Sequence, residues 1–280
     1  GLDIYAIRAK GYQLATPLRL LDVATMRQYQ RADTPDILVQ HITDSTNSQL
    51  MNKLREGLQL QSGQVLVAEA QTAGRGRRGN HWVSPFGSNL YFSMYWSLQR
   101  GIQAAMGLSL VIGVAVAELL QQLFAIEVQL KWPNDIYIQG QKVGGILVEL
   151  AGQSHASCDV VIGLGLNVYL ADAQRQAIQQ RVTALHQHVA QLIDRNVLVP
   201  QLQQHLITEL MQFEQVGFAP YAQRFNARDC FAGLPVQISG AAQLVGICRG
   251  VDVQGALLVE TAQGIQTVFG GEVSLRPTEL

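Results

Sequence analysis

Four short apolar runs follow one another between residues 128 and 162, and this succession constrains the fold more than any other feature of the chain. The runs are Val128 to Lys131, Ile136 to Ile138, Val143 to Leu150 and Val160 to Ile162. Antiparallel strands are joined by tight turns, whereas parallel strands need a crossover of a dozen or more residues. The short connections therefore predict an α+β fold with a mixed sheet, not a doubly wound parallel sheet.

A long apolar stretch upstream of these runs is typical of a buried helix. It extends from Leu108 to Leu120 and is interrupted by Gly113 and Glu118. Because a membrane-spanning helix needs about 20 apolar residues, this stretch is too short to cross a bilayer. We expect a core helix over residues 102–124 and no membrane partner.

A second helix is expected where hydroxyl, amide and carboxylate side chains precede an apolar repeat. Residues 44–47 read Asp-Ser-Thr-Asn, and Leu50, Leu54 and Leu58 follow at helical spacing. Side chains of these polar types accept hydrogen bonds from the first free N–H groups of a helix. The segment therefore predicts a helix that begins with its own N-terminal cap.

The two ends of the chain differ in character from its middle. Residues 2–14 read as two short extended runs, and residues 172–213 are expected to be helical with a break near residues 194–196. From Leu234 onward, short β-rich runs alternate with glycines. That alternation predicts a small β-barrel of about 45 residues.

Composition and charge exclude several classes of protein. The 280 residues are 48% hydrophobic, enough for a large core, and the formal net charge is −1. Near-neutrality argues against bulk binding of a polyanion. Cys158, Cys230 and Cys248 are odd in number and far apart in sequence, so a disulfide framework or a structural zinc site is not expected, and a reducing cytoplasm is the expected location.

A loop of alternating glycine and arginine follows the apolar run at residues 65–68. Residues 74–79 read G-R-G-R-R-G, which matches the dinucleotide-binding pattern literally. That fingerprint requires a following helix and an acidic residue about 20 positions on. Here Pro85 interrupts the helix, and no acidic residue lies between Glu69 and Glu118. We interpret the loop instead as a mobile flap whose arginines bind a phosphate, with a solvated basic turn as the alternative.

Three further segments have residue types suited to chemistry, and each also has a purely structural interpretation. Residues 131–135 read K-W-P-N-D and present a carboxylate that could hold Mg²⁺, or form only a tight hairpin. Lys142 with Gly144 and Gly145 could position a carboxylate substrate, or the lysine could be merely solvated. Residues 163–167 read G-L-G-L-N, a platform for a flat ligand or a glycine-rich strand end.

In this order the four segments resemble the biotin protein ligases, in particular the bacterial type that is both ligase and repressor. The likeness extends from about Gly1 to Arg276. It implies a mixed-sheet catalytic domain of the kind shared with class II aminoacyl-tRNA synthetases, over residues 22–230, and an SH3-like barrel over residues 231–280. It further implies that residues 1–21 are the end of a winged helix-turn-helix domain whose recognition helix precedes Gly1.

The resemblance also implies a reaction and a set of site residues. Biotin and MgATP would give biotinyl-5′-adenylate, and the biotinyl group would pass to a lysine of a biotin carboxyl carrier protein. Lys142 and Arg77 are the expected catalytic residues, and Asp135 the expected Mg²⁺ ligand. The expected biotin contacts are Ser45, Thr46, Asn47, Gln71, Arg75, Gly76, Arg77 and Lys142. The expected ATP and adenylate contacts are Arg75, Arg77, Arg78, Asp135 and Asn167.

Glycines 144, 145, 163 and 165 are expected to shape the pocket floor, and Arg276 to approach the site. The family's second loop packs a tryptophan on adenine, whereas Gln180 to Thr183 of this chain contain none. The resemblance implies a homodimer, with operator DNA bound only through the segment before Gly1. A lipoate-protein ligase and a non-catalytic, biotin-responsive repressor are the alternatives.

Overall fold

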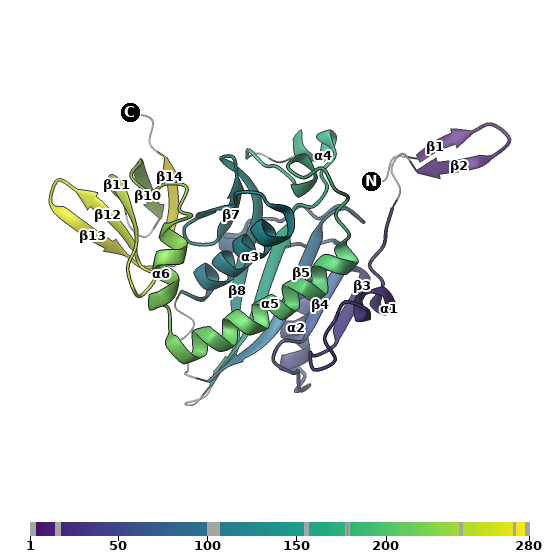
Figure 1. Ribbon diagram of the computed structural model, residues 1–280, viewed down its shortest axis with the longest axis horizontal. Helices are drawn as coiled ribbons and strands as arrows, with labels where there is room; N and C mark the ends of the chain where they lie inside the picture. The colour runs from purple at the N-terminus through teal and green to yellow at the C-terminus, as the bar shows by residue number, and fades with distance from the viewer. Residues whose placement is uncertain are drawn as a thin grey trace.

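The computed structural model describes residues 4–14, 18–99, 107–153, 157–176, 178, 180–240, 243–270 and 273–277. A seven-stranded sheet forms its centre, in the order β3-β4-β5-β9-β8-β7-β6 (Figure 1). The strands are β3 (Ile37–Thr43), β4 (Val65–Gln71), β5 (Leu90–Leu98), β6 (Gln129–Lys131), β7 (Asp135–Ile138), β8 (Gln141–Gln153) and β9 (Cys158–Leu166). Only β3 and β4 pair in parallel, and the other neighbours are antiparallel, so the predicted mixed sheet is confirmed.

Helices cover both faces of this sheet. The helices are α1 (Val23–Arg27), α2 (Thr46–Arg55), α3 (Leu108–Phe124), α4 (Asp172–Gln176), α5 (Arg195–Val216) and α6 (Ala219–Asn226). Successive side chains of a strand point to opposite faces. Accordingly Val65 and Val67 join the main core with α3 and α5, whereas Leu66 packs with Leu50 and Met51 of α2 on the other face. β5 is therefore buried on both sides along nearly its whole length.

The C-terminal residues form a second, smaller sheet of five antiparallel strands, ordered β13-β12-β11-β10-β14. The strands are β10 (Pro235–Gly240), β11 (Leu244–Val251), β12 (Leu257–Thr261), β13 (Gly264–Val268) and β14 (Val273–Pro277). The indole Nε1 of Trp132 donates to the carbonyl of Gly255 at 3.2 Å. Leu130 N donates to the carbonyl of Arg228 at 2.8 Å. The K-W-P-N-D hairpin thus joins the central sheet to the C-terminal sheet.

At the other end, a hairpin of β1 (Ile4–Ile7) and β2 (Gly11–Leu14) projects away from the body (Figure 1). Residues 19–22, by contrast, are held by the start of α5. Arg195 donates to the carbonyl of Arg19, and Asn196 donates to that of Leu20. Leu21 is buried, and its N–H donates to the Glu69 carboxylate.

Three expected boundaries differ from the structure. The helix expected over residues 102–124 begins at Leu108, and residues 102–106 lie outside the described residues. The capped helix α2 begins after its N-cap Ser45, as expected, but it ends at Arg55, so Leu58 lies beyond it and is exposed. In the expected final β-run, residues 271 and 272 lie outside the described residues.

The helix expected over residues 172–213 is wrong in its middle. α4 ends at Gln176, a 3-10 turn occupies Leu185–Gln187, and α5 begins at Arg195 after its N-cap Asp194. The intervening backbone bonds elsewhere in the fold. Lys142 N donates to the carbonyl of Arg181, and Thr183 N donates to that of Lys142. These tertiary hydrogen bonds replace the intrahelical ones that the residue pattern alone predicts.

Candidate functional site

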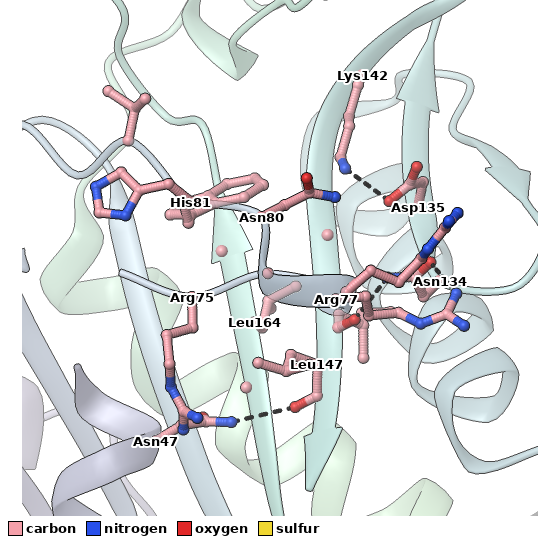
Figure 2. A pocket seen from close by; sticks show the side chains of 18 of the residues that line it. Asn47, Arg75, Arg77, Asn80, His81, Asn134, Asp135, Lys142, Leu147 and Leu164 are labelled. Atoms are coloured by element: carbon pink, nitrogen blue, oxygen red, sulfur yellow. Dashed lines mark hydrogen bonds and ion pairs between the residues drawn. The ribbon is translucent and has the colours of Figure 1, made fainter. Parts of the chain in front are cut away.

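A cavity of about 680 Å³ lies against β5, β8 and β9 and is lined by residues from all four segments singled out in the sequence. Figure 2 shows its arginine loop crossing the strands, with Asn47 at one end and Lys142 and Asp135 at the other. One end of the cavity, at the start of α2, has mostly neutral polar groups beside the Arg75–Glu149 ion pair and is called the neutral end; the other, with Lys142 and Asp135, is called the charged end.

The neutral end is a connected network around the start of α2. Thr46 donates to Gln71 Oε1 from its backbone N, at 2.9 Å, and its hydroxyl lies 3.1 Å from the same oxygen. The Ser93 hydroxyl lies 2.7 Å from Thr46 Oγ1 and 2.5 Å from Asn47 Oδ1. Ser45, Thr46, Asn47 and Ser93 are all buried. Burial of so many satisfied polar groups fixes the orientation of each donor and acceptor that faces the cavity.

The charged end is built on the hairpin of β7 and β8. Lys142 Nζ lies 2.7 Å from Asp135 Oδ1, and both side chains are mostly buried. Beside them, Arg77 Nη1 donates to Asn134 Oδ1 at 3.0 Å, and Asn134 Nδ2 donates to the carbonyl of Ile146 at 2.8 Å. Two cationic side chains and one carboxylate therefore meet within a partly dehydrated pocket, where charges interact more strongly than in water.

The arginine loop spans the distance between these ends. Arg75 Nη2 lies 2.6 Å from Glu149 Oε2, near Asn47, whereas Arg77 lies near Asn134. The loop is closed by an antiparallel bridge between Arg75 and His81. Arg78 has a φ of 58°, in the left-handed region that residues other than glycine seldom adopt. The mobility expected for this loop stays a prediction.

Glycines form the floor of the cavity because Trp82 and Asn47 lie directly on them. A Cβ added to Gly165 would lie 2.4 Å from Cε2 of Trp82, and one added to Gly163 would lie 2.5 Å from Oδ1 of Asn47. The indole Nε1 of Trp82 is buried without a hydrogen-bond partner. Lys142 Nζ lies 5.6 Å from the centre of the Trp82 ring system, a cation–π arrangement.

Two cationic groups in the cavity have altered pKa values. Burial lowers the pKa of Arg77, an effect that Asp135 opposes and Arg78 reinforces. Burial likewise lowers the pKa of Lys131, which Asp135 opposes. The Lys131 ammonium lies 5.7 Å from the ring centre of Tyr137 and 5.6 Å from that of Phe231. Asp135 is therefore the common counter-charge for the cations at this end.

Most of the residues expected at the site line this one cavity. They are Ser45, Thr46, Asn47, Gln71, Arg75, Gly76, Arg77, Arg78, Asp135, Lys142, Gly145, Gly163, Gly165 and Arg276. Asn167 does not line it: the side chain is buried, and Nδ2 donates to the carbonyl of Thr183 at 3.1 Å. Gly144 is also outside the lining, because Ile136 and Leu166 pack where its Cβ would be. Both residues therefore lie behind the cavity lining, and the ATP contact expected of Asn167 and the part expected of Gly144 in shaping the floor stay predictions.

Several residues of the site were not identified as site residues from the sequence. Ser93 hydrogen-bonds to Asn47 in the neutral network. Asn134 accepts a hydrogen bond from Arg77, and Glu149 accepts one from Arg75. Asn134 had a usable signal, since it precedes Asp135 in a tight turn. Ser93 had none, because an isolated serine in a strand is found near a site only once the sheet order is known. Glu149 ends the segment that begins at Gln141, but that segment indicated no role for it.

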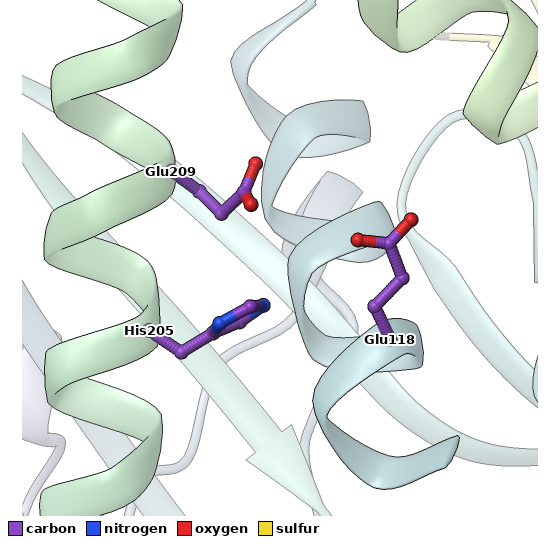
Figure 3. A group of neighbouring side chains, drawn as sticks. All are labelled: Glu118, His205 and Glu209. Carbon is purple, nitrogen blue, oxygen red and sulfur yellow. The ribbon is translucent and has the colours of Figure 1, made fainter. Parts of the chain in front are cut away.

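A second group of side chains with metal-ligand chemistry lies outside this cavity. Figure 3 shows Glu118 of α3 facing His205 and Glu209 of α5. Arg224 of α6 forms an ion pair with each carboxylate: Nη2 lies 2.5 Å from Glu118 Oε2, and Nη1 lies 2.9 Å from Glu209 Oε2. Tyr221 also donates to Glu209 at 2.8 Å. Arg224 and, at 3.9 Å from Glu118, Arg228 thus balance the charges of the two carboxylates, and the group joins three helices.

The geometry of the main cavity suits the activation of a carboxylate. Neutral donors and acceptors at one end can hold a polar head group, and a flat glycine floor with an indole can hold an apolar ring system. At the other end, Lys142 and Arg77 can stabilise charge that develops on a carboxylate or a phosphate. Among the residues that line this cavity, no hydroxyl is hydrogen-bonded to a histidine, which favours positioning and electrostatic stabilisation over an enzyme nucleophile.

Comparisons with known proteins agree with this arrangement. Residues 39–167 match the biotin/lipoate A/B protein ligase family, and residues 235–276 match the biotin protein ligase C terminal domain. The chain is 44% identical to the bifunctional ligase/repressor BirA of Salmonella typhimurium, over all of this chain and 86% of that protein. It is 33% identical to the biotin--[acetyl-CoA-carboxylase] ligase of Mycobacterium tuberculosis, over 85% of this chain and 87% of that one.

A solved structure has the same fold. The biotin protein ligase of Aquifex aeolicus, in complex with biotin and ATP, superposes with a TM-score of 0.73 at 28% identity, over 86% of this chain and 99% of that chain. Together with the full-length sequence match, this likeness shows that the chain belongs to the biotin protein ligase family.

Proposed function

We propose that this chain is an ATP-dependent biotin–protein ligase. It converts biotin and ATP to biotinyl-5′-adenylate and then transfers the biotinyl group to a lysine of a biotin carboxyl carrier protein. The observation that carries this proposal is the two-ended cavity, in which the Thr46–Gln71 network and the Lys142–Asp135 pair are bridged by one arginine loop. The relatives named as ligases and the relative solved with biotin and ATP support the same reaction.

In the first step, a carboxylate oxygen of biotin attacks the α-phosphorus of ATP and pyrophosphate leaves. Both reactants are anionic, so their approach must be made less repulsive. Lys142 and Arg77 are the cationic side chains that we assign to this task, since both lie at the charged end of the cavity. We assign the polar groups of Thr46, Asn47 and Gln71 to the biotin head, which leaves its carboxylate directed toward Lys142.

In the second step, the lysine amine of the carrier attacks the acyl carbon of the adenylate and AMP leaves. The adenylate is a reactive mixed anhydride, so water must be excluded until the carrier arrives. We assign this exclusion to the arginine loop and Trp82, which cover the glycine floor at Gly165. A lid of this kind protects a bound intermediate and opens on the timescale of loop motion.

We propose that Mg²⁺ binds at the charged end of the cavity. Mg²⁺ prefers oxygen ligands and is usually held by one or two carboxylates together with substrate phosphates. Asp135 supplies a carboxylate and Asn134 an amide oxygen at the tip of the same hairpin. When bound, the ion would neutralise charge on the ATP phosphates.

The remaining partners also belong to this proposal. A homodimer, operator binding through a preceding winged helix-turn-helix segment, and a cytoplasmic location are predictions from the resemblance and the cysteine content. Among the described residues, no helix has the length and apolar character needed to span a membrane. Cys158, Cys230 and Cys248 are all free thiols.

The test is incubation with biotin, MgATP and a biotin carboxyl carrier domain, followed by intact mass measurement of the carrier. We expect one added biotinyl group, on one lysine, and no addition when ATP is omitted. The same reaction with lipoate in place of biotin is the control, because the matching family includes lipoate ligases. Preferential transfer of lipoate would overturn the proposal, and biotin binding without pyrophosphate release would favour a non-catalytic sensor.

A further inference from the structure

Glu149 is a carboxylate that the proposed reaction does not use, yet it contacts both the arginine loop and the network at the start of α2. It lies on β8, the same strand as Lys142, and its Oε2 is 2.6 Å from Arg75 Nη2 and 2.9 Å from Asn47 Nδ2. Arg75 belongs to the arginine loop and Asn47 to the neutral network at the start of α2. One oxygen therefore joins two segments that are separate in the sequence.

The first contact orients the amide of Asn47. Its Nδ2 donates to Glu149 and, at 3.3 Å, to the carbonyl of Leu147. With both amide hydrogens directed toward β8, the amide oxygen faces Ser93 and the floor at Gly163. A flipped amide would place its NH₂ group against Ser93 and its oxygen against two acceptors. Glu149 thus determines which atom of Asn47 faces the neutral end of the cavity.

The second contact anchors the arginine loop. Figure 2 shows the Arg75 side chain running toward Asn47, away from Lys142 and Asp135. Its charge is therefore matched by a protein carboxylate, whereas Arg77, two residues later, lies at the opposite end beside Asn134. Arg75 therefore attaches the loop to the sheet, whereas Arg77 reaches the charged end of the cavity.

We infer that Glu149 is a positioning residue that anchors the arginine loop through Arg75 and orients Asn47 for the head of the substrate. The Arg75–Glu149 pair holds the loop on β8 through protein groups alone, so the anchor at its Arg75 end needs no substrate contact. The part of this inference that concerns the loop is independent of the substrate, and the part that concerns Asn47 rests on the proposed function.

The loop is tested in the ligand-free protein by limited trypsin digestion, which cleaves after arginine. Proteolysis of a transiently opened loop follows the population of its open form. Because the Arg75–Glu149 pair is partly exposed, we expect Glu149→Gln to raise the rate of cleavage after Arg77 and Arg78 by about two- to fivefold. The control is Glu127→Gln, the same change at an exposed glutamate, and cleavage after Arg31 serves as the internal reference.

Coupling is tested with Arg75→Gln alone and in combination. Two residues that act through one contact give a double variant no worse than either single variant. Equal loop cleavage in Glu149→Gln and Glu127→Gln would overturn the inference, and so would effects that multiply in the double variant. Thermal melting of each variant shows whether the whole fold, rather than the loop, has changed.

The Asn47 contact is tested by biotin binding. The glutamine variant keeps an acceptor for Asn47, so its Kd should stay within about twofold of the parent, whereas Glu149→Ala leaves one hydrogen of the buried amide unpaired and should raise Kd by about tenfold. An unchanged Kd in Glu149→Ala would contradict the assignment. If the unaltered chain binds no biotin, the proposed function fails, and the trypsin result still decides the role of Glu149 in the loop.

Discussion

Lys142 and Asp135 lie 2.7 Å apart across a hairpin whose turn and strands are local in the sequence. The ammonium is attracted to this carboxylate, and substrate phosphates must compete with the carboxylate or share it through a cation. The ion pair restricts the lysine side chain, which lowers the cost of ordering it during the reaction.

Lys142→Ala should therefore damage activation more than folding. We expect pyrophosphate release with biotin and MgATP to fall by about 100-fold or more, since a charge-stabilising group is lost. The melting temperature should change much less. Lys53→Ala, on the last turn of α2, is the matched control and should keep the parent rate. A Lys142→Ala variant that unfolds, or that retains the parent rate, would show a structural role only.

The glycines of the floor lead to a second expectation. A Cβ at Gly163 would lie 2.5 Å from Asn47 Oδ1, too close for any real contact, whereas one at Gly152 on β8 would lie 3.7 Å from Asp159 Oδ2. Gly163→Ala should lower the free energy of unfolding by about 1–3 kcal/mol and displace Asn47, which weakens biotin binding. Gly152→Ala should change neither chemical denaturation nor biotin affinity. Equal behaviour of the two variants would exclude Asn47 as the reason for the glycine.

At the scale of single residues, the sequence identified those candidate site residues that stand in short motifs of unusual composition. Arg75, Arg77, Asp135 and Lys142 were found because each stands in a segment of unusual composition. Glu149 was not found, because its partners Asn47 and Arg75 are 102 and 74 residues away in the chain. Asn167 donates through Nδ2 to the carbonyl of Thr183, a contact that no local pattern shows, and its predicted contact with ATP stays a prediction.

Elements were predictable where their signals are local. α2 begins where its N-cap Ser45 predicts, and the strands of the β6–β9 region follow the apolar runs closely. The helix predicted for the segment after α4 is wrong, because the backbone of that segment forms hydrogen bonds with Lys142 and Asn167 from other elements. The arginine loop lies between these cases: its composition indicates phosphate binding, while its attachment to β8 depends on tertiary contacts.

The third prediction concerns Arg77 of the arginine loop. Arg77 reaches the charged end of the cavity from the loop and bonds Asn134 at 3.0 Å. Replacing it by glycine removes a cation from the lid, and we expect the half-life of enzyme-bound biotinyl-adenylate to shorten by about tenfold, from the loss of one charged hydrogen bond. Early release should appear as biotinylation of lysines outside the carrier.

Arg77→Gln should show the same effect, which separates loss of charge from the added flexibility of glycine. Arg31→Gly, at an exposed arginine paired with Asp33, is the control. An adenylate half-life equal to that of the parent would contradict the assignment of Arg77 to the lid.

On the scale of the whole molecule, residues 19–22 join the N-terminal hairpin to the catalytic body through buried polar groups. Arg195 at the start of α5 lies 2.8 Å from the Glu69 carboxylate, and both are almost fully buried. Glu69 also accepts the N–H of Leu21, and it lies on β4, the strand that leads directly into the arginine loop. A buried pair of this kind is costly to break because removal of one partner leaves the other charge unpaired.

The boundary between the hairpin and the body therefore has a sharp expected position. A chain that starts at residue 18 keeps Leu18 against Gly87, Leu21 in the core and the acceptors of Arg195, so its melting temperature and its rate of carrier biotinylation should equal those of the full chain.

A chain that starts at residue 22 loses the buried Leu21 side chain, a loss worth about 2–5 kcal/mol. It also leaves Glu69 without the N–H of Leu21 and Arg195 without the carbonyl of Arg19. Its melting temperature should fall by about 5 °C or more, as differential scanning calorimetry would show. Because β4 leads into the loop, the shorter chain should also bind biotin more weakly. Equal stability of the two truncated chains would mean that residues 18–21 belong with the hairpin, whereas the predicted difference would place them in the catalytic body.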